Sequence, residues 1–88
     1  MDLSIVIPLL NEEESIKSLC NEVFTTLSDQ TIDYEVILID DGSTDNSWLV
    51  IQEIVYDFDN FKGVRLKKNQ GKSTALDIGF QFVFGNVV

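Results

Sequence analysis

The sequence predicts an α/β protein built on a parallel sheet. Apolar runs and helical patterns alternate three times along its 88 residues, which is the order of repeated β–α units. The second apolar run, residues 36–39, has no polar interruption, as expected of a strand that is buried on both faces of a parallel sheet. Three β–α units in a row imply parallel strands joined by right-handed crossovers, and 88 residues are enough for one domain at most.

The first unit begins with "LSIVIP", a strand expected over residues 3–8 and ending at Pro8. Asn11 then offers an N-cap for a helix, and Glu14 stands three residues later, as in a capping box. Apolar residues recur after it at a spacing near 3.6, which predicts a helix with one buried face. These apolar positions are Ile16, Leu19, Cys20, Val23, Phe24 and Leu27.

The second unit is "YEVILIDDGSTDNSW", residues 34–48, with Ser43 or Thr44 as the expected N-cap of its helix. The inward face of that helix is expected to carry Trp48, Ile51, Val55 and Phe58. A turn is predicted at "NFKG", residues 60–63, and a third strand at "VRLKK", residues 64–68. A third helix is predicted over residues 69–85, and residues 86–88 are expected to begin a fourth strand.

The charge of the chain is strongly acidic and unevenly distributed. The net charge is −9, from fifteen acidic and six basic residues. Five of the basic residues lie between positions 62 and 72, where they form either an anion contact or an ordinary solvated surface. The acidic remainder argues against nonspecific binding of nucleic acid, which requires lysine and arginine at the phosphates.

Histidine is absent from the sequence, and its one cysteine, Cys20, excludes an internal disulfide. We expect Cys20 to be a small buried hydrophobe in the first helix. The N-terminus has no basic residue before its apolar run, unlike a signal peptide. No apolar run approaches the roughly 20 residues of a membrane span. These features predict a cytoplasmic location.

Two adjacent carboxylates, Asp40 and Asp41, directly follow the second apolar run. Ligands of open parallel sheets bind beyond the carboxyl ends of the strands. Because side chains alternate along a strand, one aspartate can face the cleft while the other braces the turn. A carboxylate in the cleft can accept hydrogen bonds from a nucleobase or sugar, hold a divalent cation or act as a base. The plain alternative is that "DDGSTD" is only a capped turn.

Three segments, "SIVIPLLNEEESI", "YEVILIDDGSTDNS" and "KNQGKSTALDIGF", resemble in order and spacing the start of the family-2 glycosyltransferases. The likeness is greatest to the polyprenyl (dolichol or undecaprenyl)-phosphate sugar transferases and covers essentially the whole chain. It implies an incomplete Rossmann-like, three-layer β–α–β repeat in a single partial domain, residues 1–88, which is the N-terminal part of a GT-A fold. This part is expected to bind a nucleotide-diphosphate sugar. It also implies transfer by the full-length enzyme to a polyprenyl phosphate or saccharide acceptor, in the synthesis of cell wall or polysaccharide.

The resemblance also assigns substrate-binding residues. Pro8, Leu10 and Glu12 match the segment that contacts the nucleoside, although Leu10 stands where many members have an aromatic residue. Asp41 matches the residue that contacts the base or ribose, and Ile39 a backbone neighbour of that contact.

The third segment matches the part of the family that closes over the nucleotide. There the "N-x-G-K" pattern falls on Asn69, Gly71 and Lys72. Asp40 is a second-tier candidate for substrate binding. No catalytic residue and no metal ligand is expected in these 88 residues.

Similar enzymes hold Mg²⁺ or Mn²⁺ on an Asp-x-Asp motif after a fourth strand, where the cation offsets the charge of the diphosphate. The sequence ends at Val88, where that strand would begin, so the metal ligands and acceptor region are expected outside it. The 88-residue chain alone is therefore expected to be inactive in transfer. The resemblance places the full-length enzyme at the cytoplasmic face of a membrane. An open sheet edge beside the first strand offers a contact for a second copy.

Rival interpretations account for single motifs. A P-loop needs a glycine where Leu66 stands, before "NQGKST". A receiver-like signalling domain places its paired acids after the first strand rather than the second. A calcium loop needs a bidentate glutamate in its twelfth place, which "DDGSTDNSWLVIQE" does not supply. A non-catalytic remnant that binds a nucleotide or a partner stays open as an alternative.

Overall fold

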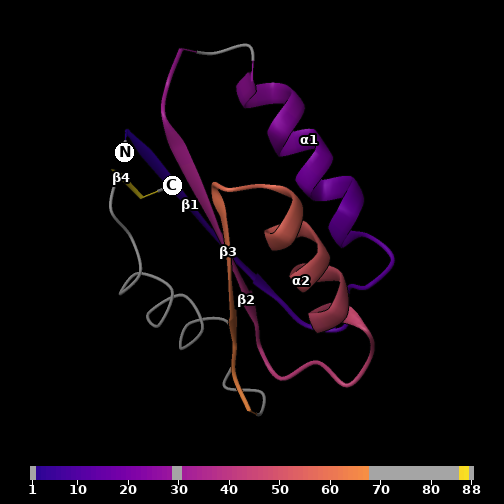
Figure 1. The fold of residues 1–88 in the computed structure, drawn as a ribbon. Helices are drawn as coiled ribbons and strands as arrows, with labels where there is room; N and C mark the ends of the chain where they lie inside the picture. The colour runs from indigo at the N-terminus through magenta and orange to yellow at the C-terminus, as the bar shows by residue number, and fades with distance from the viewer. Residues whose placement is uncertain (1, 29–30, 68–85, 88) are drawn as a thin grey trace.

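The computed structural model describes residues 2–28, 31–67 and 86–87 (Figure 1). Its elements are β1 (Leu3–Leu9), α1 (Ile16–Ser28), β2 (Tyr34–Asp40), α2 (Ser47–Asp57), β3 (Phe61–Arg65) and β4 (Asn86–Val87). The strands form one sheet in the order β3-β2-β1-β4, and each pair is parallel. The predicted α/β class with a parallel sheet is confirmed. The third helix expected at residues 69–85 lies outside the described residues.

The order of the strands reverses at β1, because β2 and β3 lie on one side of it and β4 on the other. Such a reversal is the point at which open α/β sheets bind ligands, beyond the carboxyl ends of the strands. The topology therefore marks the segment after β1 as the first place to look for a site.

Strand β2 is the centre of the molecule. All seven of its residues are buried, and it pairs with β1 along its whole length and with β3 from Val36 to Asp40. The unbroken apolar run that predicts a doubly covered strand is thus confirmed. Both faces of a strand need apolar side chains when neither face meets water.

Helices α1 and α2 cover the same face of the sheet, as Figure 1 shows. Ile16 and Cys20 of α1 and Ile51 of α2 pack in one cluster with Val36 and Leu38 of β2. Cys20 is buried as expected, and burial raises the pKa of its thiol to about 11. The 3.6-residue spacing therefore identifies most of the inward positions of both helices. The expected inward position of Phe24 is wrong, since its side chain is 38% exposed, and the buried Ile54 of α2 is not among the expected positions.

The opposite face of the sheet carries a second, smaller cluster. Val6, Ile37 and Ile39 are buried there, with Val64 and Leu66 packed against them. Glu35 is also completely buried, and its nearest cation is Lys62, with 3.9 Å between Nζ and Oε1. Neither carboxylate oxygen of Glu35 has a hydrogen-bond partner within the described part of the chain.

The predicted capping box at Asn11 and Glu14 is wrong. Helix α1 begins at Ile16, whose backbone N–H donates to the carbonyl of Glu12 at 3.1 Å. Asn11 has a positive φ of 52° and directs its side chain to the loop after β2. The residue types favour a local cap, but a partner distant in sequence takes the amide oxygen instead.

The predicted cap of the second helix is also wrong. Helix α2 begins at Ser47, two or three residues later than a cap at Thr44 or Ser43 requires. Asn46 occupies the N-cap position without a side-chain cap bond in the described structure, and Asp45 accepts from the N–H of Ser47 instead.

The third strand begins at Phe61, so the turn predicted at residues 60–63 is wrong as well. Phe61 is buried and pairs with Val36 in the sheet. Gly63 favours a turn in the sequence, but in the structure it lies within β3 and allows α2 to pack closely against the strand. A Cβ at Gly63 would lie 2.8 Å from Cγ2 of Ile51, so the close approach of α2 requires glycine.

The expected fourth strand is confirmed as β4, which pairs with Leu3 and Ser4 of β1. The edge of β1 that was expected to be open is therefore covered at these two residues. No helix among the described residues is both long and apolar enough to span a membrane.

Candidate functional site

The segments after β1 and β2 stay side by side beyond the ends of their strands. The N–H of Asp41 donates to the carbonyl of Leu9 at 2.8 Å, and the N–H of Leu66 donates to the carbonyl of Asp40 at 2.8 Å. These bonds continue the sheet pattern past the last strand residues. Asp41 is thereby placed beside the end of β1, where the sequence predicts it.

Asn11 joins the first loop (residues 10–15) to the second loop (residues 41–46). Its Oδ1 accepts from the N–H of Thr44 at 2.9 Å and from the N–H of Asp45 at 3.4 Å. In the other direction, the N–H of Asn11 donates to Oγ of Ser43 at 2.9 Å. The two loops therefore hold each other through donors and acceptors on both sides.

The same seam continues toward the start of α2. The N–H of Glu12 donates to Oγ of the buried Ser47 at 3.0 Å, and the N–H of Glu13 donates to Oδ2 of Asp45 at 3.4 Å. Oδ1 of Asp45 accepts from the N–H of Ser47 at 2.9 Å. We call these bonds between residues 11–13 and 43–47 the loop seam.

The seam lowers the pKa of Asp45 below its ordinary value of 3.8. The main cause is the hydrogen bond with the Ser47 side chain, and the backbone N–H groups of Ser47 and Glu13 add to it. Hydrogen bonds to the ionised form favour that form.

A depressed pKa in the folded state makes Asp45 stabilising above about pH 4, and this contribution is lost as the pH falls through the folded pKa. We therefore expect Asp45→Asn to be less stable than the wild type at pH 6 and nearly equal to it at the lowest pH at which both fold. Urea unfolding at several pH values measures the difference. Asp59→Asn, at an exposed aspartate outside the seam, is the control. A stability difference between Asp45→Asn and the wild type that does not change with pH would show that the ionised carboxylate of Asp45 does not stabilise the fold.

Asp40 points into the protein and holds the turn. Its side chain is fully buried, and Oδ1 accepts from the N–H of Ser43 at 2.9 Å. Oδ2 lies 4.0 Å from Nε of Arg65 and has no hydrogen-bond partner among the residues described. The guanidinium of Arg65 in turn lies over the ring of Trp48, 5.7 Å from its centroid. Gly42, with φ of 79°, supplies the left-handed turn residue.

A hollow of about 550 Å³ opens beside the end of β1. It brings together three of the predicted site residues, Pro8, Leu10 and Glu12. The rest of its lining is Ile7, Leu9, Ser15, Ile16 and Leu19. A mostly apolar lining with a few polar groups is typical of small-molecule sites.

The other predicted residues are placed differently. Asp41 lies outside the lining of this hollow and is only 3% exposed. The side chain of Ile39 is buried in the second-face cluster, so only its backbone can meet a ligand. Asn69, Gly71 and Lys72 lie outside the described residues.

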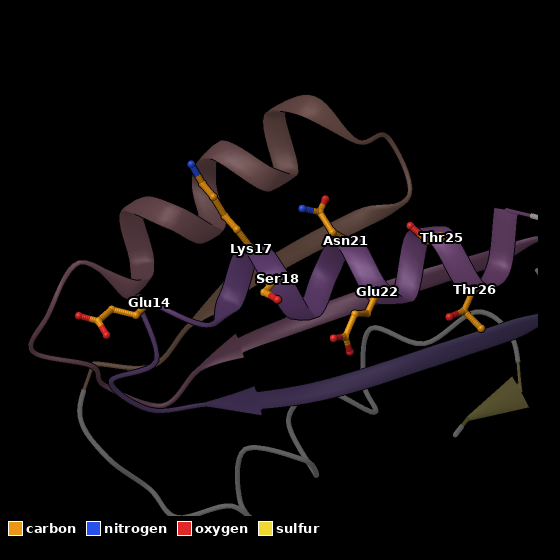
Figure 2. Close-up of a pocket in the computed structure, with 7 residues that line it drawn as sticks. All are labelled: Glu14, Lys17, Ser18, Asn21, Glu22, Thr25 and Thr26. Atoms are coloured by element: carbon orange, nitrogen blue, oxygen red, sulfur yellow. The ribbon is translucent and has the colours of Figure 1, made fainter.

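A larger hollow of about 750 Å³ runs along the outer side of α1, from Glu14 of the first loop to Thr26. Figure 2 shows its lining side chains, Glu14, Lys17, Ser18, Asn21, Glu22, Thr25 and Thr26. Nζ of Lys17 is engaged with Oε2 of Glu53 at 2.8 Å, and both side chains are largely exposed. This surface contains none of the predicted site residues.

The described residues do not fit a divalent cation. Within residues 2–28, 31–67 and 86–87, no three histidine, cysteine, aspartate or glutamate side chains form a group that could hold one. Asp40 is committed to the turn and to the side facing Arg65. We therefore assign no chemical step in this part of the chain to a metal.

Sequence reasoning misses the seam residues Ser43, Asp45 and Ser47 as elements of the site. Their signal is present, since aspartate, asparagine and serine are dense in the second loop and their short side chains bond readily to the backbone. Composition does not show that the donors of each loop pair with acceptors in the other loop. That pairing depends on the sheet, which brings the loops together.

Comparison with known proteins gives consistent relatives. The chain is 38% identical over 87 residues to the undecaprenyl-phosphate 4-deoxy-4-formamido-L-arabinose transferase of Pseudomonas fluorescens, covering 98% of this chain and 26% of the relative. The enzyme of the same name from Proteus mirabilis is 37% identical over 87 residues, with 27% of its length covered. The chain thus spans about a quarter of the length of these relatives.

Solved structures share the fold. The Staphylococcus aureus protein TarS, in a crystal structure with UDP-GlcNAc, matches all of this chain at 26% identity and a TM-score of 0.77, over 25% of its own length. The mannosyltransferase PcManGT of Pyrobaculum calidifontis, solved with GDP-Man and Mn²⁺, matches 93% of this chain at 18% identity and a TM-score of 0.79. The match covers 24% of PcManGT, and at this identity it speaks for the fold alone.

A family model also identifies the chain, without reference to any single relative. The model described as "Glycosyl transferase family 2" matches residues 4–88, which includes both loops of the seam. The chain belongs to glycosyl transferase family 2.

Proposed function

We propose that this chain forms the donor-nucleotide part of a glycosyltransferase that takes its sugar from a nucleoside diphosphate. The observation that carries the proposal is the seam between the loops after β1 and β2, formed where the strand order reverses. It lies at the carboxyl edge of a parallel sheet, the usual place for nucleotides in this class of fold. The transferase names of the relatives and the UDP-GlcNAc complex of TarS support it.

In this proposal Asp41 reads the nucleoside. An ionised carboxylate accepts a hydrogen bond from the imide N–H of uracil or from a ribose hydroxyl. Pro8, Leu10 and Glu12 frame the pocket from the side of β1, and the backbone of Ile39 adjoins it. Because Asp41 is only 3% exposed, binding requires a local rearrangement around it.

The remaining assignments follow the family pattern. Asn69, Gly71 and Lys72 are proposed to close over the nucleotide, and Asp40 to brace the turn that carries Asp41. The bound nucleotide is proposed to be UDP, as in the TarS complexes, and the acceptor a polyprenyl phosphate, from the names of the relatives. The divalent cation of transfer and the acceptor site are assigned to the rest of the enzyme, which acts at the cytoplasmic face of a membrane.

Calorimetric titration of UDP into the 88-residue chain tests the proposal. We expect UDP to bind and inorganic pyrophosphate to bind more weakly, since the nucleoside supplies the recognition. Asp41→Asn replaces one acceptor oxygen by a donor at constant shape and is expected to weaken UDP binding by about tenfold or more. Transfer from UDP-GlcNAc to undecaprenyl phosphate by this chain alone is not expected.

Asp59→Asn is the matched control, because Asp59 is an exposed aspartate outside the seam and both hollows. Its UDP affinity is expected to equal that of the wild type. Equal affinity of the Asp41→Asn variant and the wild type would remove Asp41 from the site. Pyrophosphate binding as tight as UDP binding would show a simple anion contact in place of a nucleoside pocket.

A further inference from the structure

Asn11 adopts a backbone conformation that most residues avoid. Its φ of 52° is the one positive value at a non-glycine residue among those described. Asparagine tolerates this left-handed region better than most residues, at some energetic cost. Such a conformation persists where surrounding contacts determine it, and it is found preferentially at functional sites.

The contacts that determine this conformation all cross to the second loop. Oδ1 of Asn11 accepts from the N–H groups of Thr44 and Asp45, and its own N–H donates to Ser43. Asn11 is exposed, so these bonds do not serve to satisfy a buried polar core. Ser43 is nearly buried and donates its own N–H to Asp40. The connection therefore runs from the first loop into the base of the turn after β2.

The neighbours of Asn11 are the proposed pocket residues. Leu10 and Glu12 flank it in the chain and line the hollow beside β1. On the other side of the seam, Asp41 stands two residues before Ser43 and is tied to Leu9. The two halves of the proposed nucleoside pocket thus meet through Asn11.

We infer that Asn11 is a positioning residue that sets the distance between Leu10–Glu12 and Asp41 and thereby determines nucleoside affinity. The inference rests on the proposed function. It predicts a role that works through Asp41, and not a contact between Asn11 and the nucleotide. A purely structural role would instead change stability without changing nucleoside affinity in an Asp41-dependent way.

The decisive variants are Asn11→Gly and Asn11→Asp, compared by UDP titration and thermal unfolding. Glycine keeps the positive φ and loses the amide oxygen, and UDP affinity is expected to fall about tenfold. Aspartate keeps an acceptor oxygen at the same place and tolerates positive φ, so it is expected to restore affinity to within about threefold. Asn21→Ala, in the outer hollow of α1 in Figure 2, is the control and is expected to bind UDP as the wild type does.

A double-mutant cycle with Asp41→Asn separates positioning from general support. If Asn11 acts by placing Asp41, Asn11→Gly weakens UDP binding much less in the Asp41→Asn background than in the wild type. Equal losses in both backgrounds overturn the inference, as does an Asn11→Gly variant with wild-type affinity. If Asn11→Gly does not fold, Ser43→Ala replaces it in the cycle. Ser43→Ala removes the acceptor of the Asn11 N–H, and its effect on UDP binding is expected to depend on Asp41 in the same way.

The failures of the two proposals are distinguishable. A wild-type chain that does not bind UDP, or an Asp41→Asn variant that binds it unchanged, overturns the proposed function and this inference with it. UDP binding that depends on Asp41 and is indifferent to Asn11 overturns the inference alone.

Discussion

Replacement of Glu35 by methionine is expected to raise the free energy of unfolding by about 1–3 kcal/mol. Glu35 is 0% exposed, and neither of its oxygens has a hydrogen-bond partner in the described structure. Its only recorded ion-pair partner there, Lys62, lies 3.9 Å away at the outer limit of an ion pair. Burial of a charge costs several kcal/mol, and a pair this long offsets only part of that cost. Methionine fills the site without the charge and adapts its shape to the neighbours.

Lys62→Met is expected to lower the free energy of unfolding, because it leaves the buried carboxylate of Glu35 without its cation. Loss of one partner costs about 3–5 kcal/mol in fully buried pairs. Here about 1–3 kcal/mol is expected, because the Lys62 side chain is 39% exposed and water already screens the pair. Urea unfolding of both variants and of the double variant measures these values and their coupling.

Lys67→Met, at an exposed lysine just after β3, is the matched control and is expected to change stability by less than about 0.5 kcal/mol. A Glu35→Met variant less stable than the wild type would show that Glu35 is better paired in solution than these distances allow. It would then be a net stabilising residue of the second face.

Asp40→Ala is the second substitution with a large expected effect, a loss of about 2–3 kcal/mol in the free energy of unfolding. The change removes the acceptor of the Ser43 N–H at the base of the second loop. It leaves that donor without its charged partner in a buried turn, and an unsatisfied buried donor bears its full desolvation cost. Chemical denaturation of the variant gives the loss directly.

Arg65→Met separates the two contacts of Asp40. The guanidinium is 4.0 Å from Oδ2, and the Arg65 side chain is 54% exposed, so its removal is expected to cost less than Asp40→Ala, about 1 kcal/mol. The hydrogen bond to Ser43 stays in place in that variant. A larger loss for Arg65→Met than for Asp40→Ala would mean that the ion pair, and not the hydrogen bond, holds the turn.

The parts of the fold that the sequence predicts well are those decided by burial. An unbroken apolar run identifies β2, and the 3.6-residue spacing identifies the inner face of α1, since both patterns record which side chains leave water. The start of β3 is missed because asparagine and glycine at positions 60 and 63 favour a turn locally. Pairing of Phe61 with Val36 and contact of Gly63 with α2 override that preference.

The helix starts are missed for a related reason. Asn11, Ser43 and Thr44 have the chemistry of helix caps, and their bonds go to the opposite loop or to the base of the turn. A sequence shows what a polar side chain can bond to, and the tertiary fold selects the partner. The same holds at the site, where the position of Asp41 beside β1 is predictable from the topology but its near-complete burial is not.

The seam also has a consequence for exchanging parts between related proteins. Its hydrogen bonds join positions 32 to 35 residues apart in the chain, and each loop supplies both donors and acceptors to the other. A graft that brings in one loop from a homologue therefore disrupts several of the hydrogen bonds between the loops together. The interchangeable module is the pair of loops together, and substitutions in one should be tracked against compensating substitutions in the other.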